Sequence, residues 1–443
     1  MIKVPKEVAR IMKTLGDAGF ENYVVGECVL QSLMGEDPYS WDVITKAGFA
    51  ELVKLFPDAT VLSEKYSTLR YELIDDEVDE EGNLLYEEGY IIDISTYRAK
   101  NVGEDVADGE SIFADNVEGD LARRDFPITA IAINPFVGAH SVVDPYEGRE
   151  DIRKKLVRSI GDPDEAMKAA PIRMMKAIRY ASEYDFDLQK SLYDAITRNY
   201  KLLENAKMSW VRDEFTDILT GKYAGKGLNM LMSTGIVRVI LGEQSFSRLS
   251  RREKADMMAL CDGITNTKQV PERRLGLFYS IIDKKRSMPS ITKLGFDPET
   301  HQHLVDAVHD MPKLYFTTRT EALKKFIYKR GMDRYEYLLN LEKAQRLAFG
   351  YDSQLKIEAK MYLLNEIKNN GEVIFPEDLV IDANDLIEAG ICTEANADKM
   401  ILMLTESTHI KPKQNTREEL FKVAKRYKRN KIAAMGRGIK WLR

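Results

Sequence analysis

The arrangement of apolar residues changes near residue 151, and this change limits the possible folds of the 443-residue chain more than any other feature. Before it, short apolar runs typical of strands are mixed with segments of helical periodicity. After it, Leu-, Met-, Ala-, Lys- and Glu-rich segments with a period of about 3.6 residues continue to the end of the chain. We therefore predict an α+β domain with a mixed or antiparallel sheet, followed by an all-α remainder.

Local signals predict the elements of the first domain. A helix is expected within 1–20, then a strand at 23–25 that enters a turn at Gly26, and a helix that stops at Gly35. The later elements are a helix at 49–56 and strands at 41–44, 68–74 and 90–97. The acidic segment 75–83 is predicted to be a solvated hairpin loop. Glycine and proline residues interrupt the helical remainder near 161–163, 221–227, 287–297, 371–376 and 390.

Membrane and export signals are missing from the sequence. No apolar run approaches the roughly 18–20 residues that a membrane span needs, and the first residues lack the apolar core of a signal peptide. The cysteines Cys28, Cys261 and Cys392 lie far apart, without the spacing of a zinc site or a redox pair. These features predict a cytoplasmic protein with reduced thiols and no membrane partner.

Charge is distributed unevenly along the chain. The net charge is −6, yet residues 411–443 carry 12 Lys and Arg against 2 Glu, which leaves −16 on the first 410 residues. Such a basic end can neutralise phosphates and release counterions, although a solvated helix has the same composition. The candidate RNA-binding residues in this segment are Lys422, Lys425, Arg426, Lys428, Arg429 and Lys431.

Three stretches occur in the order and spacing of one known family. They are YVVGECVLQSLMGEDPYSWDVIT at 23–45, DLARRDFPITAIAINPFVGAHSVVDPYEGRED at 120–151 and RSIGDPDEAMKAAPIRMMKAIRYASEYDF at 158–186. Together they resemble the class II nucleotidyltransferase family of bacterial tRNA CCA-adding enzymes and poly(A) polymerases. The resemblance implies a nucleotidyltransferase-like head at 1–150, a helical neck at 151–220, a helical body at 221–345 and a helical tail at 346–443.

The resemblance also implies a metal site. The family joins an RNA 3′ hydroxyl to the α-phosphate of a nucleoside triphosphate, and two Mg²⁺ ions held by carboxylates would activate the hydroxyl and neutralise the leaving group. Two Asp at i and i+2 on a strand present both side chains on one face, and a third carboxylate comes from a neighbouring strand. Asp42 fills the second position and Asp93 the third, whereas Ser40 stands at the first. Asp42 and Asp93 are thus the candidate catalytic residues and metal ligands, with Mg²⁺ as the cofactor if transfer is active and no cofactor otherwise.

Three segments are expected, by the same resemblance, to contact the nucleotide. The glycine turn lets backbone amides approach the phosphates, the Arg-Arg-Asp triad at 123–125 matches the segment that contacts ribose and phosphate, and the neck helix contacts the base. The candidates are Gly26, Arg123, Arg124, Asp125, Arg173 and Arg179. For the triad, a purely structural role that ties the head to the neck is the alternative.

Several positions depart from the family pattern. The replacements are Glu27 for the second glycine of the turn, Leu30-Gln31 for an Arg-Asp pair, Ser67 for a glycine and Ala169-Ala170 for a Glu-Asp pair. Glu27 adds bulk and negative charge where a polyphosphate is expected, and an alanine cannot accept a hydrogen bond from a base. The losses therefore fall on the metal, phosphate and base contacts of a single reaction.

Two functions follow from these observations, and the sequence leaves open whether the protein is an enzyme. The first is a family homologue that binds tRNA or another structured RNA with impaired or absent nucleotidyl transfer. The alternative is an active RNA 3′-end nucleotidyltransferase that adds CCA or A with rebuilt metal ligands, for which Glu27, Glu36 and Asp37 are the nearby carboxylates. A nucleoside triphosphate and a protein are further candidate partners.

Overall fold

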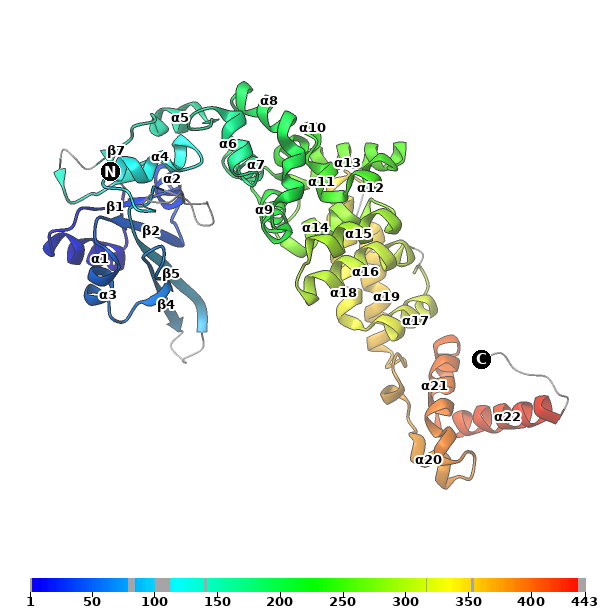
Figure 1. The fold of residues 1–443 in the computed structure, drawn as a ribbon. Helices are drawn as coiled ribbons and strands as arrows, with labels where there is room; N and C mark the ends of the chain where they lie inside the picture. The colour runs from blue at the N-terminus through cyan, green and yellow to red at the C-terminus, as the bar shows by residue number, and fades with distance from the viewer. Residues whose placement is uncertain are drawn as a thin grey trace. The chain divides into compact units, whose positions relative to one another are not determined.

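The computed structural model describes residues 2–78, 84–99, 112–138, 142–315, 317–351 and 354–436. Its chain forms two compact units (Figure 1). The first unit comprises Met1–Ile218 and Met230–Val239, and the second comprises Leu219–Asn229 and Ile240–Arg443. Among the described residues, the strands lie in the first unit, and the second unit is helical, as the sequence predicts. A short parallel pair of β8 (Leu156–Val157) and β9 (Asp187–Leu188) lies in the part of the first unit that was predicted to be helical throughout. The finer division into head, neck, body and tail stays a prediction.

A mixed sheet forms the centre of the first unit. Within the described residues it has seven strands in the order β3-β4-β5-β2-β1-β6-β7. The strands are β1 (Asn22–Val25), β2 (Ser40–Thr45), β3 (Thr60–Ser63), β4 (Thr68–Val78), β5 (Leu84–Thr96), β6 (Ala132–Ile133) and β7 (Val142–Val143). β2 and β5 pair in parallel, and the other neighbours pair antiparallel. The mixed sheet confirms the predicted α+β class.

The period-2 alternation of the central strands sorts their side chains onto two faces. Trp41 and Val43 of β2 pack in one apolar cluster with helix α1 (Lys6–Asp17), whose buried stripe has helical spacing. Ile44 of β2 belongs to a second cluster, which includes Val117 and Leu121 of helix α4 (Val117–Ala122). Asp42, between Trp41 and Val43, therefore faces the side of the sheet that α4 covers.

Figure 1 labels, in chain order, the other helices of the first unit and those at its boundary with the second unit. They are α2 (Glu27–Met34), α3 (Phe49–Leu55), α5 (Gly148–Lys154), α6 (Pro163–Ala169), α7 (Arg173–Tyr184), α8 (Lys190–Asn199), α9 (Met208–Thr220), α10 (Ala224–Ser233) and α11 (Ile236–Leu241). Helix α2 ends as predicted at Gly35, which adopts the left-handed conformation with φ 84°.

The second unit is built from helices. They are α12 (Glu243–Ser247), α13 (Arg251–Gly263), α14 (Pro271–Ser280), α15 (Lys284–Leu294), α16 (Pro298–Leu314), α17 (Thr320–Arg330), α18 (Met332–Ala348), α19 (Gln354–Asn369), α20 (Ala383–Glu388), α21 (Glu394–Ile410) and α22 (Arg417–Gly436). Fully buried Arg274 donates to the carbonyl oxygens of Leu219, Gly221 and Thr267, so its charge is satisfied by backbone. No helix in the described ranges is long and apolar enough to cross a membrane.

The predicted acidic loop at 75–83 is only partly correct. β4 and β5 form the expected antiparallel hairpin, but their pairing continues through Glu77–Tyr86 to Val78–Leu84. Residues 75–78 therefore belong to β4, because cross-strand hydrogen bonding outweighs the weak strand preference of acidic residues. Residues 79–83 lie outside the described part of the chain.

Candidate active site

Two aspartates lie side by side on the face of the sheet that α4 covers. Asp42 of β2 is in parallel register with Asp93 of β5. Gly26 caps helix α2 with φ 91°, and a Cβ there would lie 2.9 Å from Oδ2 of Asp42 and 3.2 Å from Nη1 of Arg124. The turn thus needs glycine for its backbone angle and for its close approach to both side chains. The structure brings together three of the predicted site residues, Gly26, Asp42 and Arg124, with Asp93 on the adjacent strand.

Asp93 is already paired with an arginine. Arg70 lies directly opposite on β4 and donates from Nε to Oδ1 at 2.7 Å and from Nη2 to Oδ2 at 2.8 Å. Both carboxylate oxygens are therefore used in a bidentate pair. Burial raises the pKa of Asp42, although Arg124 acts in the opposite direction.

The donors present do not fit a pair of divalent cations. Ser40 begins β2 as an exposed residue, and Glu36 and Asp37 are exposed as well. Among the residues that the structure describes, no group of three or more His, Cys, Asp or Glu could hold a metal ion. Of the two predicted ligands, Asp93 is bound bidentately by Arg70 and only Asp42 is not. One such carboxylate is too few, because hard dications need several oxygen ligands.

Asp120 binds the side chains of two arginines. Its fully buried carboxylate accepts hydrogen bonds from Nη2 of Arg123 at 2.9 Å, from Nε and Nη2 of Arg124 at 3.1 and 2.9 Å, and from the backbone N–H of Arg98 at 3.0 Å. Burial alone would raise the pKa of Asp120, but Arg124 and Arg123 outweigh burial and hold the pKa below its ordinary value. Burial lowers the pKa of Arg123 to about 10. Sequence reasoning named both arginines but missed Asp120 and Arg98, although Asp120 stands three residues before Arg123.

The third member of the triad, Asp125, binds helix α7. Asp125 accepts from Nε of Arg173 at 2.6 Å and from Nζ of Lys176 at 2.9 Å, both on α7. Arg173 also donates to the carbonyl oxygen of Arg123 at 3.2 Å and is buried. Asp125 and Arg173, two predicted nucleotide-binding residues, are thus partners of each other, in agreement with the structural alternative for this segment.

Arg179 of α7 is enclosed by carboxylates. Its Nη1 and Nη2 donate to the two oxygens of Glu27 at 2.8 and 2.9 Å, its Nε donates to Glu214 at 3.0 Å, and Nη1 also reaches Glu183 at 3.1 Å. The guanidinium lies 4.5 Å from the ring centre of Tyr180, whose hydroxyl donates to Glu27. All three guanidinium nitrogens are therefore occupied.

The pKa values of Glu27 and Glu183, both beside Arg179, are shifted in opposite directions. Burial would raise the pKa of Glu27, but hydrogen bonds from Arg179 outweigh burial and lower it. Burial raises the pKa of Glu183 to about 7, with Arg179 acting in the opposite direction. The negative charge that Glu27 adds at the turn is thus matched by Arg179, one of the two α7 arginines for which the family resemblance predicts a nucleotide contact. Glu183 and Glu214 were missed because nothing in their local sequence marks them.

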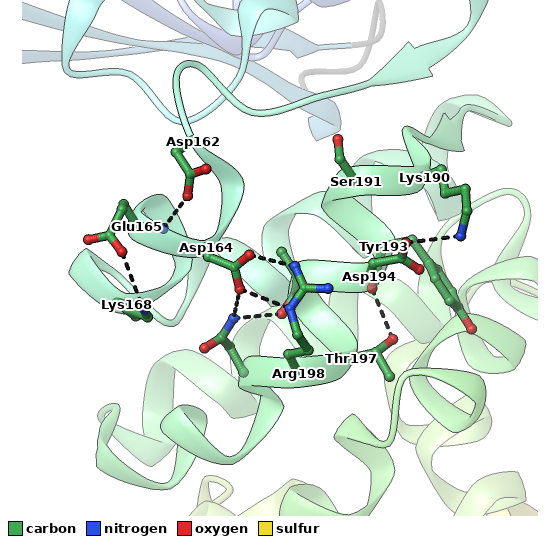
Figure 2. Close-up of polar contacts among 12 residues, drawn as sticks. Asp162, Asp164, Glu165, Lys168, Lys190, Ser191, Tyr193, Asp194, Thr197 and Arg198 are labelled. Carbon is green, nitrogen blue, oxygen red and sulfur yellow. Dashed lines mark hydrogen bonds and ion pairs between the residues drawn. The ribbon is translucent and has the colours of Figure 1, made fainter.

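Three of the other replaced positions lie in defined local environments. Ser67 is buried with φ 46°, a left-handed conformation that favours the glycine expected there. Leu30 is fully buried, so it replaces a charge with apolar packing. Ala169 ends α6, which is fixed to α8 where Asp164 accepts from Arg198 and Asn199 (Figure 2).

The basic segment of the second unit lies on α22. Leu420 and Ala424 are buried in an apolar cluster with α20 and α21, while the basic side chains between 422 and 429 are exposed. Lys422 pairs with Glu419 at 3.1 Å, and Lys428 donates to the carbonyl oxygen of Gly390 at 3.1 Å. Lys425, Arg426 and Arg429 are exposed on the same helix, and the side chain of Lys431 lies outside the described residues. The amphipathic helix thus presents a basic face.

A glycine turn, an aspartate pair on a mixed sheet and two arginines that directly follow α4 define a nucleotidyltransferase-type head. Residues 22–158 match the family described as poly A polymerase head domain, and residues 185–246 match the family described as probable RNA and SrmB-binding site of polymerase A. Over 22–158 and 185–246, these matches confirm the resemblance to the class II nucleotidyltransferase family of CCA-adding enzymes and poly(A) polymerases.

Its similarity to individual relatives is moderate. It is 28% identical over 232 residues to the CCA-adding enzyme of Geobacillus stearothermophilus, covering 52% of this chain and 53% of that protein. It is 29% identical over 246 residues to the CCA-adding enzyme of Geobacillus thermodenitrificans, covering 55% and 57%. The matched stretch spans about half the length of these curated relatives.

Two solved structures share the fold. The Bacillus stearothermophilus CCA-adding enzyme in complex with CTP superposes with a TM-score of 0.74 at 20% identity, covering 97% of this chain and 98% of that one. The Thermotoga maritima CCA-adding enzyme complexed with tRNA gives 0.62 at 18% identity, with 95% of each chain covered. The fold thus extends over both units, whereas the stronger sequence similarity covers about half of the chain.

Proposed function

We propose that the protein binds tRNA or a related structured RNA and that its nucleotidyl transfer is impaired or absent. The observation that carries the proposal is the enclosure of Arg179, whose three guanidinium nitrogens bind Glu27, Glu183 and Glu214. A nucleobase would have to displace carboxylates from a partly buried site, and a neutral base edge is a weaker acceptor than a carboxylate.

The metal site gives independent support. Asp93 is held by Arg70, and Ser40 offers a hydroxyl where a bridging carboxylate is expected. A hydroxyl that bridges two dications would be a poor ligand compared with a carboxylate. Both departures weaken the same reaction, which favours a loss of transfer over independent drift.

RNA binding is supported by the basic face of α22 and by the shared fold with a relative solved with tRNA. Exposed Lys and Arg side chains on one helix can contact successive phosphates and make binding sensitive to salt. We further propose a cytoplasmic location, where such an RNA would be met.

The alternative function is active transfer of CCA or A to an RNA 3′ end with Mg²⁺. It is supported by the retained register of Asp42 with Asp93. Of the carboxylates that could rebuild the site, Glu27 binds Arg179, and Glu36 and Asp37 are exposed.

Incorporation of labelled CTP and ATP into tRNA without its 3′ CCA tests the proposal, first with Mg²⁺ and then with Mn²⁺. We expect tRNA to bind at moderate salt and no label to be incorporated. Incorporation that disappears in Asp42→Ala would establish the alternative, and the loss of tRNA binding would refute the proposed RNA-binding role.

A further inference from the structure

A cavity lies beside helix α1, on the face of the sheet opposite Asp42. It has a volume of about 1010 Å³ and is bounded by one face of α1, by the turn from α1 to β1 and by residues that follow β6. Helix α1 packs in the apolar cluster of Trp41 and Val43, whereas Asp42 faces the side that α4 covers. The cavity also adjoins the start of β1, while Gly26 follows the end of that strand. It is therefore separate from the candidate active site.

We propose that this cavity binds an unpaired segment of RNA, with phosphates at the cations of α1 and a base against the ring of Phe136. The inference rests on the proposed RNA binding and adds to it a contact surface on the first unit, apart from the basic face of α22. The segment is single-stranded, because a base inside a duplex is stacked on both sides and cannot present its face to an aromatic side chain.

One face of α1 presents a row of positive charge to the cavity. Lys6, Arg10 and Lys13 line it and are exposed. Their spacing of four and three residues places them on one side of the helix, over a length of about 10 Å. None of these three side chains pairs with a carboxylate among the residues that the structure describes. Such a row is complementary to a chain of phosphates, whose counterions it would release.

Another wall of the cavity carries exposed apolar side chains. Phe136 is 57% exposed and Val137 is 49% exposed. Asn134 fixes the start of this loop, because its Nδ2 donates to the carbonyl oxygen of Asn22 at 2.8 Å and its Oδ1 accepts from the backbone N–H of Phe136 at 2.9 Å. The backbone of Phe136 is thus anchored to the sheet while its ring stays exposed. A base could stack on such a ring with little loss of side-chain freedom.

Acceptor groups line the cavity at the turn between α1 and β1. Asn22 is 3% exposed and donates from Nδ2 to the carbonyl oxygens of Met12 and Phe20, both at 3.1 Å. Its Oδ1 accepts no hydrogen bond within the described ranges, and a buried acceptor without a donor is costly. The carboxylates of Asp17 and Glu21 also line this end. Acceptors suit the N–H groups of a base and repel phosphate, so the base should lie toward the turn and the phosphates along α1.

Fluorescence anisotropy tests the proposal, with the full chain titrated into a labelled single-stranded RNA of about ten nucleotides. The double variant Arg10→Glu with Lys13→Glu should bind this RNA at least about tenfold more weakly. Its slope of log affinity against log salt should fall by about 1.4 or more, because two phosphate contacts are lost. The matched control is Lys54→Glu with Lys65→Glu, which reverses two exposed charges of the first unit outside the cavity and should bind as the wild type does.

Substitution of Phe136 tests the stacking contact separately from charge. Phe136→Leu keeps an apolar side chain but removes the ring, so affinity should fall at least about fivefold while the salt slope stays unchanged. Phe136→Trp keeps a ring and should retain the wild-type affinity. Since all the substituted side chains are exposed, we expect the variants to fold, and their thermal unfolding curves verify this.

Other results would overturn the inference. Wild-type affinity in either the double variant of α1 or Phe136→Leu, with tRNA still bound by the wild type, would remove the cavity from the RNA contacts and leave the proposed RNA binding intact. An equal loss in the control would mean that binding follows overall charge and not this cavity. Tighter binding of an acidic peptide that carries one phenylalanine, lost in the same variants, would assign the cavity to a protein partner. If the wild type binds neither tRNA nor the single-stranded RNA, the proposed function fails as well.

Discussion

The ion cluster around Arg179 should contribute measurably to the stability of the first unit. Glu27→Ala removes the acceptor of two guanidinium N–H groups and of the Tyr180 hydroxyl. Removing one partner of a buried pair costs about 3–5 kcal/mol. The cost should be lower here, at about 1–2 kcal/mol, because Arg179 keeps Glu183 and Glu214 and Glu27 is 32% exposed. For a unit of this size, that corresponds to a fall in Tm of about 2–8 °C.

Tryptophan fluorescence during urea and thermal unfolding is the assay, since Trp41 is buried in the first unit. Glu27→Gln keeps the size of the side chain and one acceptor oxygen, so its stability should lie between that of the wild type and that of Glu27→Ala. A sharper test makes the same substitution in the Arg179→Leu variant. In that variant, Glu27, Glu183 and Glu214 lack the cation that they share. There, Glu27→Ala should stabilise the protein, because it relieves repulsion between like charges.

A reversal of sign between the two backgrounds means a coupling of at least about 1 kcal/mol between Glu27 and Arg179. If Glu27→Ala destabilises both backgrounds equally, or changes neither, the two side chains do not interact as described. The argument for an enclosed Arg179 would then fail.

Three further predictions concern the turn, the pH dependence of stability and the basic helix. Gly26→Ala should lower the free energy of unfolding by about 1–2 kcal/mol more than Gly19→Ala, because both have positive φ but only Gly26 would also bring a Cβ 2.9 Å from Asp42; urea unfolding measures the difference. Since the pKa of Glu183 is raised to about 7 in the fold, the folded state holds its proton more tightly, and stability should fall as pH rises from about 4.5 to 7. The Glu183→Gln variant lacks this carboxyl group, so its free energy of unfolding should fall by about 1–3 kcal/mol less than that of the wild type over this pH range. A difference in unfolding free energy between the two proteins that stays constant from pH 4.5 to 8 would contradict the assignment. Lys425→Glu should weaken tRNA binding and reduce the slope of log affinity against log salt by about 1 or more, and an unchanged slope would remove this residue from the RNA contacts.

Much of the architecture could be predicted from periodicity. The apolar residues around Asp42 predict a strand at 41–44, and the structure adds that Asp42 is in register with Asp93. The helical stripe within residues 1–20 likewise predicts α1 and its buried face. These features depend on neighbours in the sequence, which is why local patterns were sufficient.

The partners of the charged residues could not be predicted in the same way. Glu27 and Arg179 are 152 residues apart, and Arg70 and Asp93 are 23 apart on paired strands. Hydrophobic periodicity predicts which face of a strand or helix is buried, but it does not predict which charged side chains form ion pairs. One signal was available: a carboxylate, Glu27, replaces a glycine while Arg173 and Arg179 are retained, and a carboxylate and an arginine have complementary charges.

The enclosure of Arg179 also bears on how this sequence can change over evolutionary time. Restoring glycine at position 27 would free the turn, yet Arg179 would still bind Glu183 and Glu214, and Asp93 would still bind Arg70. Reverting Glu27 alone therefore loses its ion pair with Arg179 and leaves the pairs of Arg179 and Asp93 with their other partners in place.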